Sequence, residues 1–378
     1  MSTEQRKDYD SANFDLLATE LESRFHDGVA MPWTETEFER RSLKAFAHQF
    51  DYCSPYRAFC ERRGITPGTV AGWEEIPAVP ATAFKYFDFV SAPTRDDSAV
   101  FQTSGTTRGH EARGCHHIPR LSLYRASLLP PLEAALLSGL PEPMRFLSLV
   151  PDPKGVPESS LSYMVGAAAE RYAAQTDWLV DAEGNFDEAR LSSVLEVVHD
   201  ANEPVLVLGT ALAFLHVLDR SDLRLGPLPD GSRIMETGGF KGARRTISRE
   251  ELYQRISLET QVSTERIVNE YGMTELLSQL YEPVLTEGLD AVGVHLAPPW
   301  LRVRALDPTT LHRLPEGEDG ILAFFDLANL GSICHVLTED IGSVAEGRVR
   351  LRGRVPGSEP RGCSRAMDDL MAAAGSVR

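Results

Sequence analysis

Arg266-Ile-Val-Asn-Glu-Tyr-Gly-Met-Thr-Glu275 joins a short apolar run to a loop of small and polar residues. Similar apolar runs occur earlier, at residues 146–150, 204–208 and 233–235, with longer amphipathic stretches between them. The first two of these runs have almost no polar alternation, as expected of parallel strands that are covered on both faces. We therefore predict a layered α/β domain, in which ligands gather at the carboxyl ends of the strands.

The beginning of the chain shows a helical pattern. One apolar stripe at helical spacing runs from Phe14 to Phe25, and a second runs from Phe38 to Phe50. Stripes of this kind usually face a hydrophobic core. We expect one large domain over residues 1–345, with a mainly helical lead-in over residues 1–90, and a short C-terminal segment over residues 346–378.

Composition limits the possible partners. The 378 residues carry a formal net charge of −17 at pH 7, with 42% hydrophobic and 25% charged residues, so the chain can bury a large core. The acidic balance argues against nucleic acid as a partner, because its binding usually requires a basic surface. The first ten residues lack the apolar core of a signal peptide, and no uninterrupted apolar run could span a bilayer. We expect a cytoplasmic protein without a membrane span.

The cysteines predict free thiols. They are scattered, odd in number and never in C-x-x-C spacing: Cys53, Cys60, Cys115, Cys334 and Cys363. This pattern argues against a disulfide framework or structural zinc. Cys115-His-His117 gives little support for a metal site, because adjacent ligands do not easily converge on one ion. We expect His116 and His117 to line a pocket edge or the loop after Gly114.

Thr103-Ser-Gly-Thr-Thr107 suits a loop that wraps phosphate oxygens. Gly105 gives the backbone freedom, and hydroxyl groups stand beside main-chain N–H groups at Thr103, Ser104, Thr106 and Thr107. A run of this composition alone is typical of a surface turn. The strand-like residues 100–102 and the polar, basic residues 108–113 favour an anion-binding loop. It is not a Walker loop, because the lysine of that motif is absent.

Two further segments offer groups for a nucleotide. In Tyr271-Gly-Met-Thr-Glu275, the side chains of Thr274 and Glu275 provide the hard oxygen ligands that magnesium prefers. The second segment follows the predicted strand at 233–235, and its glycines permit close backbone approach while its lysine supplies a cation: Gly238, Gly239 and Lys241. We expect this loop to lie beside the nucleotide.

Four segments, in their order along the chain, resemble motifs of the adenylate-forming enzymes. They are the loop at 103–107, the Tyr-Gly-x-Thr-Glu motif at 271–275, Thr338-Glu-Asp340 and Gly353-Arg354. Within that superfamily the chain resembles the LuxE-type acyl-protein synthetases, the long-chain-fatty-acid–luciferin-component ligases, over nearly its whole length. This closer resemblance rests on Phe101-Gln-Thr-Ser-Gly-Thr-Thr107, Glu236-Thr-Gly-Gly-Phe-Lys241, Glu270-Tyr-Gly-Met-Thr-Glu275, Asp326-Leu-Ala-Asn329 and Arg361-Gly-Cys-Ser364.

The resemblance implies a two-step ligase. ATP with magnesium would activate a carboxylic acid, in this family a fatty acid, as acyl-AMP, and a cysteine near the C-terminus would carry the acyl group to an acyl-CoA-reductase-like partner. The catalytic residues so implied are Cys363, Lys241 and Glu275. Those implied for nucleotide binding are Thr103, Ser104, Gly105, Thr106, Thr107, Gly238, Gly239, Tyr271, Gly272, Thr274, Asp340 and Arg354, with magnesium on Thr274 and Glu275.

The chain departs from the superfamily pattern near its C-terminus. Full-length adenylate-forming enzymes carry a C-terminal domain with a late lysine, whereas here no lysine follows Lys241. We therefore expect a truncated C-terminal stub, with Lys241 or Arg354 neutralising the α-phosphate. In the superfamily that C-terminal domain moves to admit coenzyme A, so its loss favours a thiol on the protein itself as the acyl acceptor. Cys363 suits that role, because Arg361 and Arg365 flank it and neighbouring cations favour the thiolate.

Two other functions stay open at this point. In an acid–CoA ligase, or a supplier of free acyl-adenylate, a diffusible acceptor would take the acyl group and Cys363 would have no role. In a non-catalytic nucleotide-binding subunit of a reductase complex, ATP would bind without release of pyrophosphate. The acid is also open, because the residues of its pocket lie on several distant segments.

Overall fold

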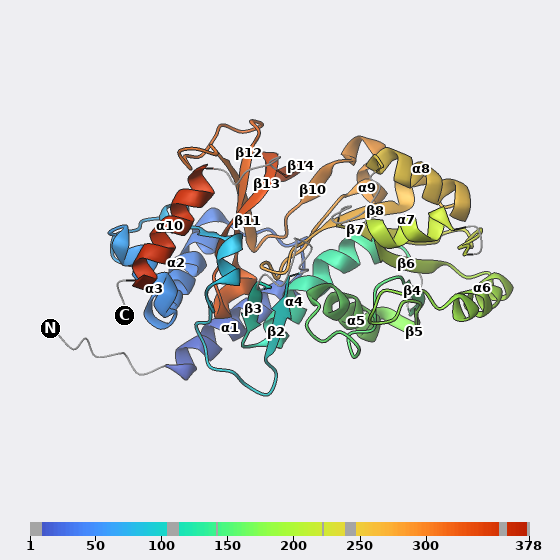
Figure 1. The fold of residues 1–378 in the computed structure, drawn as a ribbon, viewed down its shortest axis with the longest axis horizontal. Coiled ribbons are helices and arrows are strands. Elements are labelled where there is room, and N and C mark those ends of the chain that lie inside the picture. Colours follow the sequence, from blue (N-terminus) through green and yellow to red (C-terminus); the bar gives the residue numbers. More distant parts are fainter. Residues whose placement is uncertain are drawn as a thin grey trace.

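The computed structural model describes residues 10–103, 113–140, 143–220, 223–238, 247–354 and 361–375 (Figure 1). Its described part opens with three helices, α1 (Ser11–His26), α2 (Glu35–Tyr52) and α3 (Ser54–Arg62). Thr34 caps α2 by accepting a hydrogen bond from the Glu37 N–H at 3.1 Å. The apolar stripes supply the buried faces of α1 and α2, which confirms the predicted helical opening of the fold.

One large sheet runs through the molecule. Its strand order is β11-β12-β13-β14-β10-β9-β8-β7-β6-β4-β5, and β1 (Val79–Pro80) pairs with β13. The parallel strands are β4 (Met144–Ser148), β5 (Ala173–Trp178), β6 (Val205–Thr210), β7 (Arg233–Thr237) and β8 (Ile267–Tyr271). The antiparallel strands are β9 (Leu280–Tyr281), β10 (Val294–Leu296), β11 (Leu301–Leu306), β12 (Gly320–Asp326), β13 (His335–Ala345) and β14 (Arg348–Arg354). All four predicted strands of the α/β pattern are present and parallel.

Helices cover both faces of the parallel strands. Along β6, Val205 and Val207 point into one hydrophobic cluster while Leu206 and Leu208 point into another. The first cluster is covered by α6 (Glu188–Ala201), α7 (Ala211–Asp219) and α8 (Arg249–Thr260), and the second by α4 (Leu121–Leu132) and α5 (Ser160–Tyr172). Burial on both faces explains why the strand lacks polar alternation.

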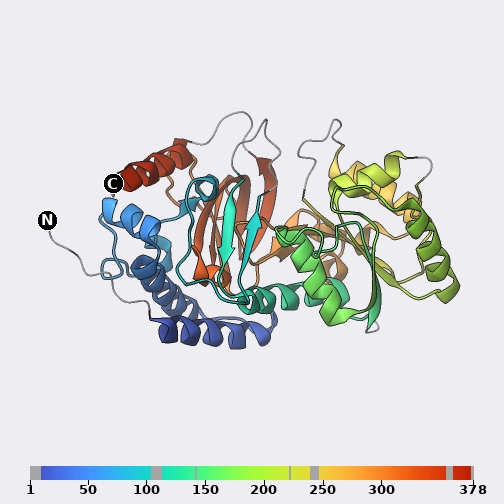
Figure 2. The same cartoon turned by 60° about the horizontal axis from the view of Figure 1, so that its bottom comes forward.

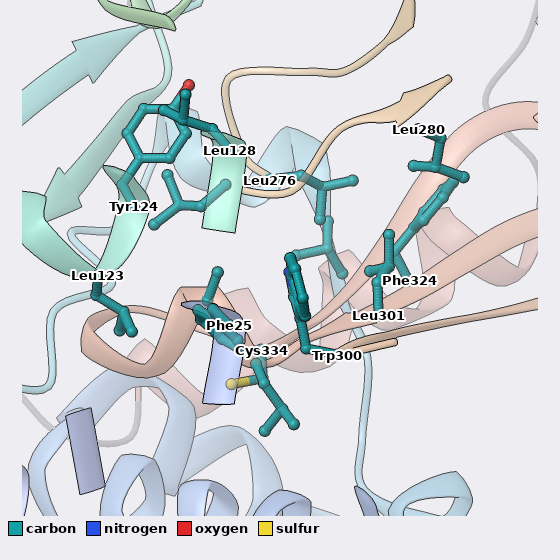
Figure 3. Packing of buried hydrophobic residues seen from close by; sticks show 14 of the residues in the cluster. Phe25, Leu123, Tyr124, Leu128, Leu276, Leu280, Trp300, Leu301, Phe324 and Cys334 are labelled. Atoms are coloured by element: carbon teal, nitrogen blue, oxygen red, sulfur yellow. The ribbon is translucent and has the colours of Figure 1, made fainter. Parts of the chain in front are cut away.

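The antiparallel strands pack against the N-terminal helices. Phe25 of α1 lies 4.5 Å from Trp300, between ring centroids, and both side chains are fully buried. Figure 3 shows these two rings beside Cys334, with Leu301 and Phe324 on the strand side. The core of the lead-in is therefore continuous with the core of the sheet.

Shorter elements complete the described chain. A separate two-stranded hairpin is formed by β2 (Ala99–Gln102) and β3 (Cys115–Ile118). A π-helical turn (Glu133–Leu137) extends α4, α9 spans Val284–Glu287, and 3₁₀ turns occupy Trp73–Glu75, Ala81–Lys85, Thr264–Arg266, Leu289–Ala291 and η6 (Leu327–Gly331). β13 ends at Ala345, and Glu346 and Gly347 form the turn that leads to β14.

The last described element is α10 (Arg361–Gly375), which packs against α3 (Figure 2). Arg63, the residue directly after α3, donates a hydrogen bond to the Asp369 carboxylate at 2.8 Å. At the other end of α10, the Gly362 N–H donates to the Pro308 carbonyl at 2.9 Å. None of the helices in the described ranges is both long and apolar enough to cross a membrane.

Candidate functional site

The site lies where β8 meets the antiparallel half of the sheet. The Tyr271 hydroxyl donates to Asp340 Oδ2 at 2.8 Å, and Arg354 Nε donates to Asp340 Oδ1 at 2.9 Å. The pairing of β13 with β14 sets Asp340 directly opposite Arg354. Three residues that are far apart in the sequence, and that were all predicted to bind nucleotide, therefore form one connected cluster.

The Tyr271 side chain is held firmly. Its ring stacks on Phe324 of β12, with 5.6 Å between centroids and 21° between planes. Burial, and then the adjacent Asp340 carboxylate, raise the pKa of Tyr271 well above its usual range. The phenol therefore remains a hydrogen-bond donor at neutral pH, and one face of the ring is already covered by Phe324.

The backbone of Thr274 and Glu275 is held by two side chains from other elements. The Nδ1 atom of His116, on β3, lies 2.7 Å from the Thr274 carbonyl oxygen. The Asn329 amide, on η6, donates to the Glu275 carbonyl at 2.8 Å. The Glu275 side chain is largely buried, with 8% of its surface exposed. Sequence reasoning did not include His116 or Asn329 among the site residues.

Asp326 fixes the residues that follow Glu275. Its carboxylate accepts hydrogen bonds from the N–H groups of Leu277 at 3.1 Å and Ser278 at 2.8 Å, and from the Ser278 hydroxyl at 2.7 Å. The Asp326-Leu-Ala-Asn329 segment, noted in the sequence only for its resemblance, thus supports the Tyr271–Glu275 segment. Asp326 and Asn329 are themselves fully buried, which is typical of positioning groups rather than ligand contacts.

A buried carboxyl group links the ends of β7 and β8. The Thr237 hydroxyl donates a hydrogen bond to Glu270 Oε2. Burial raises the pKa of Glu270 to about 7. A Cβ atom on Gly272 would lie 2.5 Å from Glu270 Oε1, so glycine at this position makes room for the carboxyl group. Gly238, directly after Thr237, has a left-handed φ of +77°, which explains its glycine.

A second buried carboxyl group lies beneath the first. Glu236 Oε2 accepts hydrogen bonds from Asn269 at 2.6 Å and from the Tyr253 hydroxyl at 3.0 Å. His295 Nε2 lies 2.7 Å from Asn269 Oδ1 and extends the network to β10. Burial raises the pKa of Glu236 to about 7. This network cross-links β7, β8, β10 and α8, and of its members only Glu236 belongs to a segment that was noted in the sequence.

The structure describes the two ends of the predicted phosphate loop, at Thr103 and Gly114, but not residues 104–112. The Thr103 N–H donates to the Gly114 carbonyl at 2.9 Å, and the Gly114 N–H donates to Thr103 Oγ1 at 3.0 Å. Residues 103 and 114 thus meet beyond the last pair of the β2–β3 hairpin, which confirms the predicted strand before the loop. The remaining predicted residues of this loop and of the second loop lie outside the described residues: Ser104, Gly105, Thr106, Thr107, Gly239 and Lys241.

Cys363 lies on α10 and is 1% exposed. Its Sγ atom is 3.7 Å from the carbonyl oxygen of Thr338, two residues before Asp340. The apolar residues clustered with it are Leu306, Ile321, Ala323 and Leu337. Arg361 and Arg365 lie on the exposed side of α10, whereas Cys363 lies on its buried side. All five cysteines are free, as predicted.

The described groups fit a nucleotide with magnesium. Asp340 presents carboxylate oxygens, each with acceptor capacity beyond its one protein donor, which suits ribose hydroxyls. Thr274 and Glu275 offer hard oxygens. No cluster of three or more His, Cys, Asp or Glu side chains that could hold a metal occurs within the described ranges. Magnesium at a phosphate site needs only one or two carboxylates, because phosphates and water complete its shell.

Solved structures of known proteins share this architecture. The structure of 2-hydroxyisobutyryl-CoA ligase with 2-HIB-AMP and CoA matches with a TM-score of 0.63 at 16% identity, over 85% of this chain and 68% of that one. ATP-bound MatB from Rhodopseudomonas palustris matches with a TM-score of 0.50 at 17% identity, over 70% of this chain. The chain spans about half of MatB, 49% of its length. The likeness shows the fold of adenylate-forming ligases and confirms the predicted fold class.

Curated relatives align along nearly the whole chain. A protein from Vibrio harveyi named long-chain-fatty-acid–luciferin-component ligase is 26% identical over 381 residues, covering 94% of this chain and 95% of the relative. A protein of the same name from Aliivibrio fischeri is 23% identical over 348 residues, covering 87% of each. The family model "Acyl-protein synthetase, LuxE" matches residues 15–372. The chain therefore belongs to the LuxE acyl-protein synthetase family.

Proposed function

We propose that this protein activates a carboxylic acid with ATP as acyl-AMP and then transfers the acyl group to Cys363. The observation that carries the proposal is the cluster of Tyr271, Asp340 and Arg354, which unites three predicted nucleotide-binding residues around one carboxylate. The family match and the ligase names of the relatives support the same chemistry.

In the first step the residues act by position and charge. Asp340 accepts hydrogen bonds from the ribose hydroxyls, while Tyr271 and Arg354 hold its carboxylate in place. Thr274 and Glu275 would hold magnesium, which would supply charge neutralisation at the phosphates. The carboxylate oxygen of the acid attacks the α-phosphorus, the bond from that phosphorus to the bridging oxygen breaks, and pyrophosphate leaves. No general base is needed, because the acid is already ionised at neutral pH.

In the second step the Cys363 thiol releases its proton to water and the thiolate attacks the acyl carbonyl carbon. A C–S bond forms, the C–O bond to the phosphate breaks, and AMP leaves. The docked position of α10 places this thiol under β13, the strand that carries Asp340. Because Cys363 is covered by apolar side chains, the proposal includes a shift of α10 before transfer.

The relatives' names suggest the class of acid and of partner. Both contain the words long-chain fatty acid, so we propose a fatty acid as the substrate. An acyl thioester on a protein is an activated carbonyl that a reductase can consume, and we propose an acyl-CoA-reductase-like protein as the next acceptor. We also propose that the protein uses ATP together with magnesium.

Intact-protein mass spectrometry tests the proposal directly. The wild type and Cys363→Ser are incubated with magnesium, ATP and a panel of fatty and aryl acids, and released pyrophosphate is measured in parallel. We expect a mass gain equal to the acyl group in the wild type, its loss in Cys363→Ser, and pyrophosphate release by both. Glu275→Gln should suppress both signals.

The other outcomes identify the alternatives. Acid-dependent release of pyrophosphate without a mass gain would instead indicate an acid–CoA ligase or a supplier of free acyl-adenylate. ATP binding without release of pyrophosphate, with the right acids present, would indicate a non-catalytic nucleotide-binding subunit. Adding CoA to the first assay separates a ligase, which would form acyl-CoA, from a supplier of free adenylate.

A further inference from the structure

We propose that His116 is a positioning residue that holds the Thr274–Glu275 backbone in the orientation its side chains need to bind magnesium with ATP. The inference rests on the proposed function, and it adds a residue on β3 that no motif assigned. Its basis is the 2.7 Å contact between His116 Nδ1 and the Thr274 carbonyl oxygen.

The contact fixes the tautomer of the imidazole. A carbonyl oxygen only accepts hydrogen bonds, so Nδ1 carries the proton and donates it to Thr274. The ring is fully buried, and burial lowers its pKa to about 4, so His116 is neutral at physiological pH. Among the described residues, Nε2 has no hydrogen-bond partner. The buried imidazole is therefore oriented by one strong polar contact, which is to a site residue.

The contact joins two parts of the fold that do not share a sheet. His116 lies on β3, in the two-stranded hairpin whose ends are paired through Thr103 and Gly114. Thr274 follows β8 of the large sheet. Packing of the Phe84 ring edge-on to His116, with 5.3 Å between centroids, keeps the imidazole in place. His116 thus ties the hairpin that leads into residues 104–112 to the segment proposed to bind magnesium.

Asn329 provides the matching contact on the next residue. Its Nδ2 atom donates one hydrogen bond to the Glu275 carbonyl at 2.8 Å and a second to the Ile333 carbonyl at 3.0 Å. Two consecutive carbonyls are therefore fixed from opposite elements, β3 and η6. Groups that orient metal-binding residues without touching the metal typically change metal affinity about 10–100-fold when they are removed.

The chain offers a matched set of variants. His116→Asn keeps an amide N–H near the position of Nδ1, whereas His116→Gln places its amide near the position of Nε2 and His116→Phe removes the donor but keeps a ring. His117→Phe is the control. The His117 ring is partly exposed, and its Nε2 lies 3.0 Å from Asp88 Oδ1 rather than near Thr274.

Binding of Mn²⁺ in the presence of ATP, followed by electron paramagnetic resonance, gives a readout that is independent of turnover. We expect about tenfold weaker Mn²⁺ binding in His116→Phe and His116→Gln. We expect His116→Asn and His117→Phe to stay within about threefold of the wild type. Circular dichroism melting of each variant identifies any that do not fold, and the Asn–Gln comparison then replaces the Phe variant.

The outcomes separate the two proposals. Equal Mn²⁺ binding by folded His116→Gln, His116→Asn and wild type would overturn the role of His116. The same holds if His117→Phe loses as much affinity as the His116 variants. A wild type that neither binds Mn²⁺ with ATP nor releases pyrophosphate with any acid would instead overturn the proposed function, whatever the variants do.

Discussion

The Asp326 carboxylate accepts hydrogen bonds from both the N–H and the hydroxyl of Ser278, at 2.8 and 2.7 Å, in a fully buried position. Because it also accepts the Ala328 N–H at 3.0 Å, its removal leaves several buried donors without this acceptor. We expect Asp326→Ala to lower the free energy of unfolding by about 3 kcal/mol, as measured by urea denaturation. Ser278→Ala, which removes one hydroxyl, should cost about 1 kcal/mol. Equal costs would show that the carboxylate does not organise this turn.

Glu270 should make the protein less stable as pH rises toward neutrality. Burial raises its pKa from 4.5 to about 7, so the folded state holds a proton that the unfolded state releases earlier. The unfolding free energy that this group contributes is fully present below about pH 4.5 and is lost as the pH rises to about 7. Urea denaturation at pH 5 and pH 8 should therefore show a smaller loss of stability in Glu270→Gln than in the wild type.

Glu236 provides the comparison for that experiment. Burial raises its pKa to about 7 as well, so Glu236→Gln should also reduce the loss of stability between the two pH values. Exposed Glu318→Gln should leave the loss unchanged. The interpretation fails if the Glu270 variant loses as much stability as the wild type over this range.

Tyr271 should contribute to nucleotide affinity through Asp340. Tyr271→Phe keeps the ring on Phe324 but removes the donor that lies 2.8 Å from Asp340 Oδ2. One hydrogen bond of this kind corresponds to about three- to tenfold weaker ATP binding, measurable by isothermal titration calorimetry. Tyr281→Phe is a suitable control, since the Tyr281 hydroxyl contacts Met164 Sδ within the core. Unchanged ATP affinity in Tyr271→Phe would show that the Tyr271 hydroxyl does not contribute to nucleotide binding.

The seating of α10 should control the reactivity of Cys363. In the docked position its thiol is covered, whereas Cys115 is partly exposed, so a thiol reagent should label Cys115 first. Asp369→Ala removes the contact to Arg63 and should speed labelling of Cys363 about two- to fivefold. Peptide mass spectrometry resolves the two sites.

The neighbouring Asp368, which is exposed, supplies the control substitution Asp368→Ala. It should leave the labelling rate of Cys363 near that of the wild type. Labelling of Cys363 as fast as that of Cys115 in the unmodified protein would contradict the docked arrangement. Faster labelling after addition of magnesium, ATP and the acid would agree with a shift of α10 during the reaction.

The sequence predicted four of the five parallel strands, because their apolar runs are largely buried, whereas β5 was missed because Ala173–Trp178 is polar and only partly buried. It also predicted that Tyr271, Asp340 and Arg354 serve one site, although only through their resemblance to known motifs. Their meeting depends on the pairing of β13 with β14 and on the approach of β8, which no local pattern encodes.

Other parts could not be read from the sequence for physical reasons. The proposed role of His116 depends on a contact with Thr274, 158 positions away, which the Cys115-His-His117 segment does not indicate. The covered position of Cys363 follows from the packing of α10, which the flanking Arg361 and Arg365 do not indicate. The burial of the Glu236 and Glu270 carboxyl groups could not be read from the sequence either, because charged residues usually indicate surface.

Adjacent residues of β6 belong to different hydrophobic clusters, so one strand contributes side chains to the cores on both sides of the sheet. A shift of this strand by one position would exchange Val207 with Leu206 or Leu208 between the two cores and mismatch both at once. Loss of the helices on one face would likewise expose alternate residues of a strand that the other face still holds. The two cores should therefore melt together, as one cooperative unit, and the site at the strand ends should be lost in the same transition.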